Sequence, residues 1–400
     1  MTRRSPLLIL FLIVFIDLVG FGIVIPLLPY YAAHFGASPR TVTLVLATFS
    51  LAQFIASPIL GRISDRVGRR PVLLLSLAGA IVSYVILGFA DALWVVFAAR
   101  ALAGITAGNI ATAQAYITDI TPPDKRARGM GVIGAAFGLG FIIGPAIGGI
   151  LAGPDPVNAD FVAPALLAAG LSAIAWTGTL LVLPESLGAD IRAAIRRQPR
   201  IGRLAAARTH LARPVLGRLI ALGFLMIAVF SAMESTFALW AMGQFNWGPQ
   251  DTGMIFAYIG VVAAILQGGL IGRLSHRFGD ERLLITGIVA LAAGLAALAA
   301  ATTLPLVLVA TTLLAAGFGA ANPSLSSLIS RQAGLLERGA VMGVFQSASS
   351  LSRVLGPVLG GLAFAAWGRQ SPFIVGVVVL IPVLLLARRI AVLSLPATTT

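Results

Sequence analysis

The sequence predicts an all-α membrane protein in which twelve transmembrane helices form two parallel six-helix repeats. Of its 400 residues, 58% are hydrophobic and only 10% are charged, and the mean hydropathy is +0.98. Soluble domains carry about 25% charged residues. Twelve apolar runs are each long enough to cross a bilayer, which takes about 20 apolar residues. Short motifs also recur at a nearly constant offset, which is typical of a tandem duplication.

The twelve runs are separated by short polar segments, and each is expected to form one helix. The expected spans are 7–31, 42–60, 72–90, 93–117, 129–152, 162–183, 216–241, 252–271, 283–301, 304–328, 340–366 and 372–393. The first run follows a basic start but is too long for a signal peptide and lacks a small-residue cleavage site, so it is expected to stay as the first span.

Three pairs of motifs reveal the duplication. Because the pairs keep one order and an offset of 211 or 212 residues, both halves are expected to have the same membrane topology, as parallel repeats do. The pairs are GRISDRVGRRP at 61–71 with GRLSHRFGDER at 272–282, Arg126 and 130–132 with Arg338 and 342–344, and GPAIGG at 144–149 with GPVLGG at 356–361.

The basic residues predict the orientation. Twenty-four of the 28 Lys and Arg residues fall at the termini and in the alternate loops that share their side, and the positive-inside rule makes that side cytoplasmic. The expected organisation is a six-helix bundle over 1–184, a cytoplasmic linker over 185–214 and a second bundle over 215–400. The linker either forms a short amphipathic helix on anionic lipid or is a tether whose charges set the topology.

These features resemble the major facilitator superfamily, whose two halves are parallel repeats. The turn at 61–71 resembles the family's loop signature, and Arg100 followed by Gly104 resembles its fourth-span motif. GLGFIIGPAIGG at 138–149 resembles the fifth-span motif typical of the family's antiporters, which implies export against protons. FIDLVGFGIVIPLLP at 15–29 is similar to the first span of tetracycline and multidrug antiporters.

One departure bears on the substrate that this resemblance implies. Tetracycline exporters carry further carboxylates in the third and ninth spans, where this chain holds Ser83 and roughly Leu291. Those exporters carry a metal–drug chelate, so the loss of two anionic positions argues against tetracycline itself. A drug–proton antiporter remains the implied activity.

Four charged residues lie deep inside the expected spans, away from their ends, and we assign them to proton coupling: Asp17, Arg100, Glu234 and Arg353. Each would cost about 2.5–3.5 kcal/mol if it faced lipid at a helix centre, so each is expected to face the protein interior or water. At 1.5 Å per residue, Asp17 and Arg100 lie at similar depths, as do Glu234 and Arg353, so each pair could meet.

Asp17 is the preferred proton carrier. Burial raises the pKa of a carboxylate and a nearby arginine lowers it, so changing hydration or a changing distance to Arg100 could carry it across neutrality. The alternative is a permanent pair with Arg100 or the backbone that only fastens helices. Glu234 with Arg353 is either a structural clamp or a substrate or proton site. If both stay charged in a cavity, a zwitterionic or cationic amphiphile is a plausible substrate.

Amide and aromatic side chains on the expected cavity helices suit bulky, mostly apolar ligands. Each of them could equally be a helix–helix contact. These candidates are Phe49, Gln53, Asn109, Gln114, Tyr116, Phe230, Trp240, Gln267, Asn322, Phe345 and Gln346.

The charged turns are expected to act in gating. Asp65 can accept from the amino end of a neighbouring helix, and Arg69 or Arg70 can reach Asp119 at the inner end of the fourth span. In the second copy the signs are exchanged, so an ion pair with reversed signs is expected there. The glycine–proline motifs should let helices pack closely. The gating candidates are Gly61, Asp65, Arg66, Arg69, Arg70, Asp119, Arg126, Gly144, Pro145, Gly272, Arg277, Arg331 and Arg338.

No enzyme, cofactor or metal site is predicted. Cysteine is absent, the three histidines are scattered, and the single lysine belongs to no phosphate-binding glycine loop. The basic residues fall in short clusters between apolar runs rather than on one face, which argues against nucleic-acid binding.

The sequence therefore predicts a monomeric transporter of the plasma (inner) membrane with both termini in the cytoplasm. It would export amphiphilic small molecules in exchange for protons by rocker-switch alternating access. The alternatives are an exporter or flippase of a sugar or lipid metabolite, and a receptor or scaffold that transports nothing.

Overall fold

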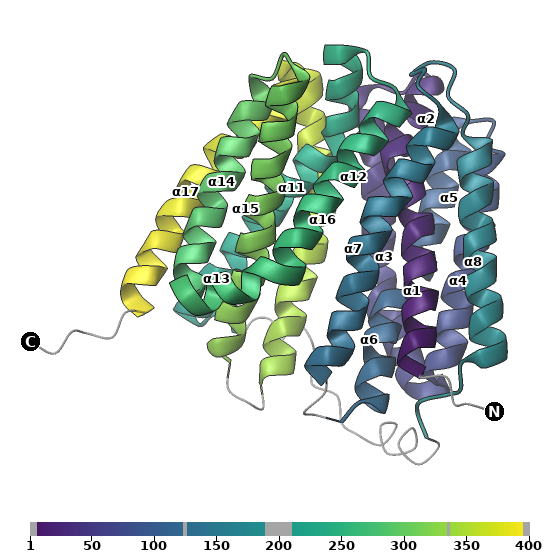
Figure 1. Cartoon of the computed structure of the whole chain (residues 1–400), viewed down its shortest axis with the longest axis horizontal. Helices are drawn as coiled ribbons and strands as arrows, with labels where there is room; N and C mark the ends of the chain where they lie inside the picture. The colour runs from purple at the N-terminus through teal and green to yellow at the C-terminus, as the bar shows by residue number, and fades with distance from the viewer. Residues whose placement is uncertain (1–5, 123–125, 189–209, 334–336, 395–400) are drawn as a thin grey trace, which may run out of the picture. The chain divides into compact units, whose positions relative to one another are not determined.

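The structure is a computed structural model that describes residues 6–122, 126–188, 210–333 and 337–394. Within these ranges the secondary structure is entirely helical (Figure 1). Twelve helices or helix pairs in the described residues are long and apolar enough to cross a membrane. They follow the order and approximate bounds of the twelve expected spans, so the predicted fold class is confirmed.

The first six spans contain most of the helices that position the candidate site. Their bounds are α1 Pro6–Val24, the 3₁₀ turn η1 Ile25–Leu27, α2 Leu28–His34, α3 Pro39–Val67, α4 Arg69–Gly88, α5 Leu93–Thr106, α6 Asn109–Ile120, α7 Arg126–Ala152 and α8 Val162–Val182.

The last six spans begin after the linker. Their bounds are α11 Pro214–Phe245, α12 Pro249–Ile265, the π-helical turn η3 Leu266–Leu270, α13 Ile271–Phe278, α14 Asp280–Ala299, α15 Leu304–Arg331, α16 Arg338–Trp367 and α17 Ser371–Ser394.

Contacts divide the chain into two compact units. The first unit comprises Met1–Pro199 with Ala241–Val261, and the second comprises Arg200–Trp240 with Val262–Thr400. The segment Ala241–Val261 thus packs with the first unit although the repeat places it in the second half. The domain boundaries expected at 184 and 215 stay a prediction.

Three spans are interrupted where the sequence suggested one continuous helix. The first changes from α1 through η1 to α2 around two prolines, which are tolerated in a first helical turn. The fourth breaks at Ala107 and Gly108 between α5 and α6. The eighth widens into the π-helical turn η3, whose five residues include two glycines. Such wide turns are rare and local.

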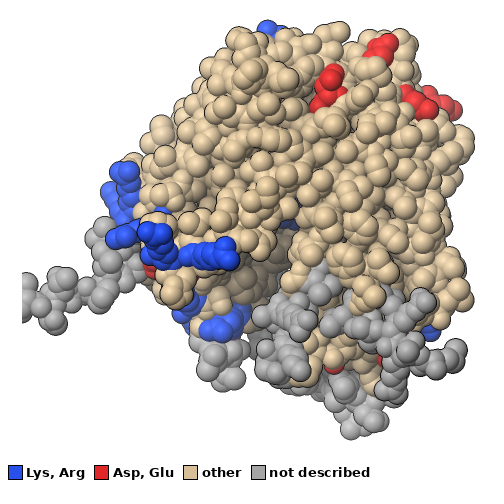
Figure 2. Space-filling model, viewed as in Figure 1, with Lys and Arg blue, Asp and Glu red and all other residues tan. Residues whose placement is uncertain are grey.

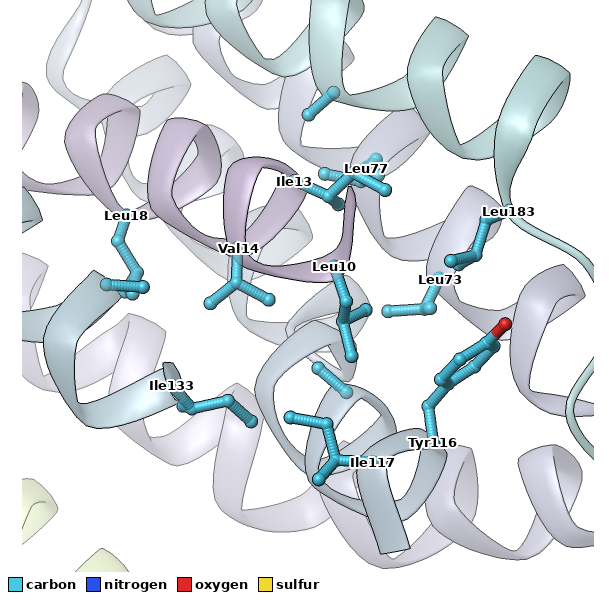
Figure 3. Packing of buried hydrophobic residues seen from close by; sticks show 13 residues of the cluster. Leu10, Ile13, Val14, Leu18, Leu73, Leu77, Tyr116, Ile117, Ile133 and Leu183 are labelled. Atoms are coloured by element: carbon cyan, nitrogen blue, oxygen red, sulfur yellow. The ribbon is translucent and has the colours of Figure 1, made fainter. Parts of the chain in front are cut away.

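Helix α1 forms the centre of the first unit. Its amino-terminal part lies in a hydrophobic cluster with residues of α4, α6 and α7, and Figure 3 shows Leu10, Ile13 and Leu77 in that cluster. Its carboxyl-terminal part packs closely on α7, because a Cβ at Gly144 would lie 2.7 Å from the Cα atom of Gly22. Only glycine permits this approach, which confirms that the GPAIGG motif packs tightly.

The second unit uses the same device in the second copy of the motif. A Cβ at Gly356 of α16 would lie 2.6 Å from the carbonyl oxygen of Ala228 on α11. Helices α14 and α15 also meet through glycine, since a Cβ at Gly317 would lie 2.5 Å from the backbone nitrogen of Leu291. Small residues at such positions let membrane helices approach closely.

Charges are distributed unevenly along each unit. On the face shown in Figure 2, basic side chains of the second unit gather around the end where α13 lies. Acidic side chains of the first unit gather at the end where α2 lies. An arginine-rich end is what the positive-inside rule expects of a cytoplasmic face.

Candidate functional site

Asp17 lies on α1 in the interior of the first unit, where its exposed fraction is 6%. The side-chain amide of Asn109, the first residue of α6, donates a hydrogen bond to Asp17 Oδ2. A cavity of about 10 Å³ adjoins both side chains and is otherwise lined by five aliphatic residues of α1, α4 and α6. That is roughly the space in which one water molecule fits.

Arg100 is also buried, with an exposed fraction of 3%. Its guanidinium carbon lies 4.4 Å from the ring centroid of Phe49, which is a cation–π contact. Its Nε has no hydrogen-bond partner in the described structure. The ion pairs found among the described residues do not include Asp17 with Arg100. The two residues therefore share the interior of one unit without forming the direct pair that the sequence allowed.

Glu234 and Arg353 lie in the second unit, on α11 and α16. Glu234 is half-buried and Arg353 is exposed. Their opposite charges are close enough to interact electrostatically, but no salt bridge joins them in the described part of the chain. Of the two alternatives for this pair, the structural clamp is therefore not formed among the described residues, and the substrate or proton site stays a prediction.

The proposed cavity residues fall into two groups. In the first group, Tyr116 and Trp240 have exposed fractions of 0%. The Tyr116 hydroxyl donates to the Pro184 carbonyl at 2.8 Å. The Trp240 ring packs on the rings of Phe237 and Phe373. Both are core residues here, and the expectation that they face an open cavity is corrected. An aromatic side chain on a helix can pack in a protein core or line a binding site, and the sequence alone does not distinguish the two.

The other aromatic and amide candidates have different surroundings. Phe345 is buried beside Gly223, and Phe230 stacks on Phe318 with ring centroids 4.0 Å apart. The remaining candidates are at least partly accessible: Phe49, Gln53, Asn109 and Asn322 are half-buried, and Gln114, Gln267 and Gln346 are exposed.

A network of charges holds the turn between α3 and α4, and we call it the first latch. Arg69 is its centre, and its side chain is 9% exposed. Arg69 Nη1 donates to Asp65 Oδ1 at 2.5 Å and to Ser64 Oγ at 3.2 Å. Arg69 Nε donates to Asp119 Oδ2 at 3.0 Å. The expected contact between this turn and the inner end of the fourth span is therefore present.

Glu185 completes the first latch, and sequence reasoning missed it. Its carboxylate accepts from the backbone nitrogens of Arg69 at 2.9 Å and Arg70 at 3.2 Å, which are the first residues of α4. Asp65, which was expected to accept from a helix amino end, instead binds the Arg69 side chain. The unpaired N–H groups of a helix start attract an anion, and Glu185 supplies it.

The second unit contains the corresponding network, which we call the second latch. Its centre is Asp280, the first residue of α14, whose side chain is 4% exposed. Asp280 Oδ2 accepts from Arg331 Nη2 at 2.7 Å and from Ser327 Oγ at 2.6 Å. Asp280 Oδ1 accepts from Ser275 Oγ at 2.5 Å. The ion pair with exchanged signs that the repeat offset predicted is confirmed.

The remaining gating candidates are less constrained. Arg70 donates to the carbonyl oxygens of Thr179 and Leu180 on α8. A Cβ at Gly61 or Gly272 would meet no atom within 4 Å, so neither glycine is required by packing. The exposed candidates are Arg66, Arg277 and Arg338, whereas the side chain of Arg126 lies outside the described residues.

The first unit also carries a contact set at the end of α1 opposite the latch, and it was not predicted. The Tyr30 hydroxyl lies 2.6 Å from Thr252 Oγ1 and 3.1 Å from the carbonyl oxygen of Gly248. Nearby, a Cβ at Gly253 of α12 would lie 2.3 Å from the carbonyl oxygen of Pro145 on α7. Glycine at 253 and the proline motif therefore meet backbone to backbone.

A family comparison decides the identity of this architecture. The model of the Major Facilitator Superfamily matches residues 10–271 and 268–399. The chain is a member of the Major Facilitator Superfamily. It is 33% identical over 358 residues to the class E tetracycline resistance protein of Escherichia coli, covering 88% of this chain and 86% of that protein.

Two further relatives of this major facilitator protein support the same assignment. It is 30% identical to multidrug resistance protein 2 of Bacillus subtilis, covering 90% of this chain and 89% of the relative. The crystal structure of the human organic anion transporter MFSD10 superposes with a TM-score of 0.72 at 25% identity, covering 97% of this chain and 100% of that one. The protein is a membrane transporter of a drug efflux family and not an enzyme.

Proposed function

We propose that this major facilitator protein exports amphiphilic small molecules in exchange for protons that enter the cell. The observation that carries the proposal is the setting of Asp17: a carboxyl group buried in the first unit, held by an amide rather than by a cation, beside a cavity of one-water size. A buried carboxylate with no fixed countercharge favours the neutral form. It can therefore gain a proton at moderate pH, as coupling requires.

The relatives support the class of substrate. Resemblance to tetracycline and multidrug resistance proteins favours a drug-like molecule, and the absence of carboxylates at Ser83 and Leu291 argues against tetracycline itself. Ser83 donates to the Ala99 carbonyl at 2.8 Å, so it serves the packing of α4 on α5. The accessible amides and Phe49 are the side chains that we propose to contact the substrate.

The contacts within each unit suggest how transport proceeds. The two latches tie the inner ends of helices together inside their own units, and Tyr30 with Thr252 ties the outer ends of α2 and α12 in the first unit. We propose that such tied units move as rigid bodies in alternating access, with the latches acting in gating on the cytoplasmic side. The protein would work as a monomer in the inner membrane with both termini in the cytoplasm.

Reconstitution tests the coupling. The purified protein in liposomes with an imposed pH gradient would be assayed with a panel of fluorescent amphiphilic drugs, alongside Asp17→Asn and the exposed loop variant Asp155→Asn. We expect gradient-driven transport by the wild type and by Asp155→Asn, and its loss with Asp17→Asn. Full-rate gradient-driven transport by Asp17→Asn would remove Asp17 as the carrier and make Glu234→Gln the next variant to test.

Topology has a separate test, because the chain contains no cysteine. Single cysteines placed in the inner turn at Arg66 and in the outer loop at Asp155 can be labelled in intact cells with a reagent that does not cross membranes. We expect labelling at 155 and protection at 66. The reverse pattern would overturn the proposed orientation.

A further inference from the structure

The break in the fourth span places Asn109 at the proton site. Helix α5 ends at Thr106, and Gly108 donates its backbone N–H to Ser76 Oγ on α4 at 3.3 Å. A Cβ at Gly108 would lie 2.8 Å from Leu60 Cδ1 and 3.2 Å from Ser76 Oγ, so the break is packed tightly between α3 and α4. Helix α6 then starts at Asn109. The amide of Asn109 thus stands at a helix start directly after the break and contacts Asp17 of α1.

The orientation of the Asn109 amide is set by its own backbone neighbour. The N–H of Ile110 donates to Asn109 Oδ1 at 2.9 Å. Because the amide oxygen is used in this way, the NH₂ group is the part that points to Asp17, and it can only donate. The contact therefore favours the form of Asp17 that accepts hydrogen bonds at both oxygens, which is the carboxylate.

The remaining charged groups around Asp17 are few. Tyr84 of α4 lies near enough to interact electrostatically with Asp17 and, separately, with Arg100 of α5, while α8, which packs on α1, carries no ionisable residue. Helix α7 carries arginines only in its first turn, and on α6 Asp119 belongs to the first latch. Among the described residues, Asn109 is the one hydrogen-bond partner found for the Asp17 side chain.

We propose that Asn109 is a positioning residue for proton coupling, whose donated hydrogen bond sets the pH at which Asp17 takes up and releases its proton. This inference rests on the proposed role of Asp17, and it reassigns Asn109 from the substrate cavity to the proton site. The adjoining cavity supports it, because it opens on the two interacting side chains and on no other polar group. Figure 3 shows the inner part of that region, where Ile13 and Leu77 lie side by side.

Two variants at Asn109 separate this role from a structural one. Asn109→Leu keeps the branched shape of the side chain and removes both the donor to Asp17 and the acceptor of the Ile110 N–H. Asn109→Asp keeps an oxygen for the Ile110 N–H, so α6 can start as before, but it puts a second carboxyl group against Asp17. Two adjacent carboxyl groups cannot both ionise easily. Both variants should therefore hold the proton to higher pH than the wild type does.

The measurement is the pH dependence of proton binding and of transport. Infrared difference spectra of the purified protein report the protonated carboxyl directly, and transport in liposomes gives the pH midpoint of exchange. We expect the midpoint to move up by about one pH unit for Asn109→Leu, which is the loss of one hydrogen bond to a charged acceptor, and further for Asn109→Asp. The matched control is Asn158→Leu, because the Asn158 amide donates to Asp155 Oδ2 at 2.9 Å in an exposed outer loop. It should leave the midpoint unchanged.

The outcomes are distinguishable from a failure of the proposed function. Unchanged midpoints in both Asn109 variants, with gradient-driven transport abolished by Asp17→Asn, would overturn the role of Asn109 alone. A changed substrate KM without a moved midpoint would return Asn109 to the substrate cavity and overturn the inference as well. If Asp17→Asn keeps coupled transport, the proposed function itself fails. In the Asp17→Asn background, Asn109→Leu should have no further effect on the infrared titration.

Discussion

The two latches are copies of one turn whose central residues carry opposite charges. In the first, a buried cation, Arg69, lies between carboxylates. In the second, a buried anion, Asp280, receives Arg331 and two serine hydroxyls. The glycine before each central residue has a positive φ, 125° at Gly68 and 80° at Gly279, so the backbone of the turn is the same device twice. The duplication therefore kept the geometry of the pair and exchanged its sign.

The helix dipole explains why the copies are not equivalent. Both central residues start a helix, where the N–H groups favour an anion. Asp280 meets that preference by itself. Arg69 opposes it, and Glu185 provides the missing negative charge by accepting from the first two N–H groups of α4. At the offset of 212 residues the second half has Ala397, which cannot take this role. The cationic copy needs an additional anion that the anionic copy does without.

Exchanging the signs of the first latch is the strongest test of this comparison. Arg69→Asp alone would add a fourth carboxyl group to those of Asp65, Asp119 and Glu185, and we expect a loss of about 4 kcal/mol in unfolding free energy, as for a broken buried pair. Adding Asp119→Arg should recover most of that loss, and adding Glu185→Ala should recover more, because the helix start would then carry its own anion. Denaturant unfolding in detergent measures each step. A double variant no more stable than the single one would show that sign is not interchangeable.

Removing Glu185 should have the next largest effect. Glu185→Ala leaves the N–H groups at the start of α4 without their acceptor, and the loss of such a cap lowers stability by about 1–2 kcal/mol. Apparent melting temperatures of the purified protein would reveal it. Ser186→Ala, which removes only a 3.0 Å hydrogen bond to Asp119, is the neighbouring control and should be milder. Equal losses of melting temperature in the two variants would mean that the interaction of the Glu185 carboxylate with the start of α4 does not stabilise the protein.

Removing the partner of each central residue, Arg331 in the second latch and Asp119 in the first, should lower stability by smaller and unequal amounts. Arg331 is 61% exposed, whereas Asp119 is 19% exposed. Arg331→Ala should therefore cost below about 1 kcal/mol, as exposed pairs do, because two serines still bind Asp280. Asp119→Ala leaves the buried Arg69 with fewer partners and should cost more. Arg62→Ala, on the same turn and bonded only to its own helix at Pro58, provides the baseline.

The smallest effect is expected from an ion pair outside both latches. Arg213 Nη1 lies 2.6 Å from Glu337 Oε2, and this hydrogen-bonded guanidinium lowers the pKa of Glu337 below its ordinary value. A carboxyl group with a lowered folded-state pKa contributes stability above its unfolded pKa and loses it as the pH falls through the folded value. Glu337→Gln should lower the melting temperature slightly at neutral pH. A difference from the wild type that persists in acid would contradict this sign.

Much of the architecture was predictable because it depends on composition and periodicity. Long apolar runs and a constant motif offset do not need side-chain geometry to be recognised, and the reversed pair of Asp280 with Arg331 followed from aligning two copies of one motif. The rise per residue puts Asp17 and Arg100 at similar heights along their spans, which stays a prediction.

The partners around Asp17 could not be predicted, because they depend on which way each helix faces. The break at Ala107 and Gly108 changes the direction of the side chains after it, and Asn109, the first residue of the next helix, is the residue that contacts Asp17. Glu185 was missed because it binds backbone N–H groups, which all residues but proline share. Its signal was nonetheless present, since two arginines open α4 and an unfavourable charge at a helix start calls for a nearby anion.

The π-helical turn at Leu266–Leu270 changes how the eighth span should be drawn. A turn of this kind holds about one residue more than an α turn, and one residue corresponds to about 100° of azimuth. A helical wheel drawn without interruption from Pro249 to Phe278 therefore assigns the wrong angular position around the helix axis to every side chain beyond the π-helical turn. Arg273 and Arg277 should be mapped on a wheel of their own, rotated by that step relative to the wheel of α12.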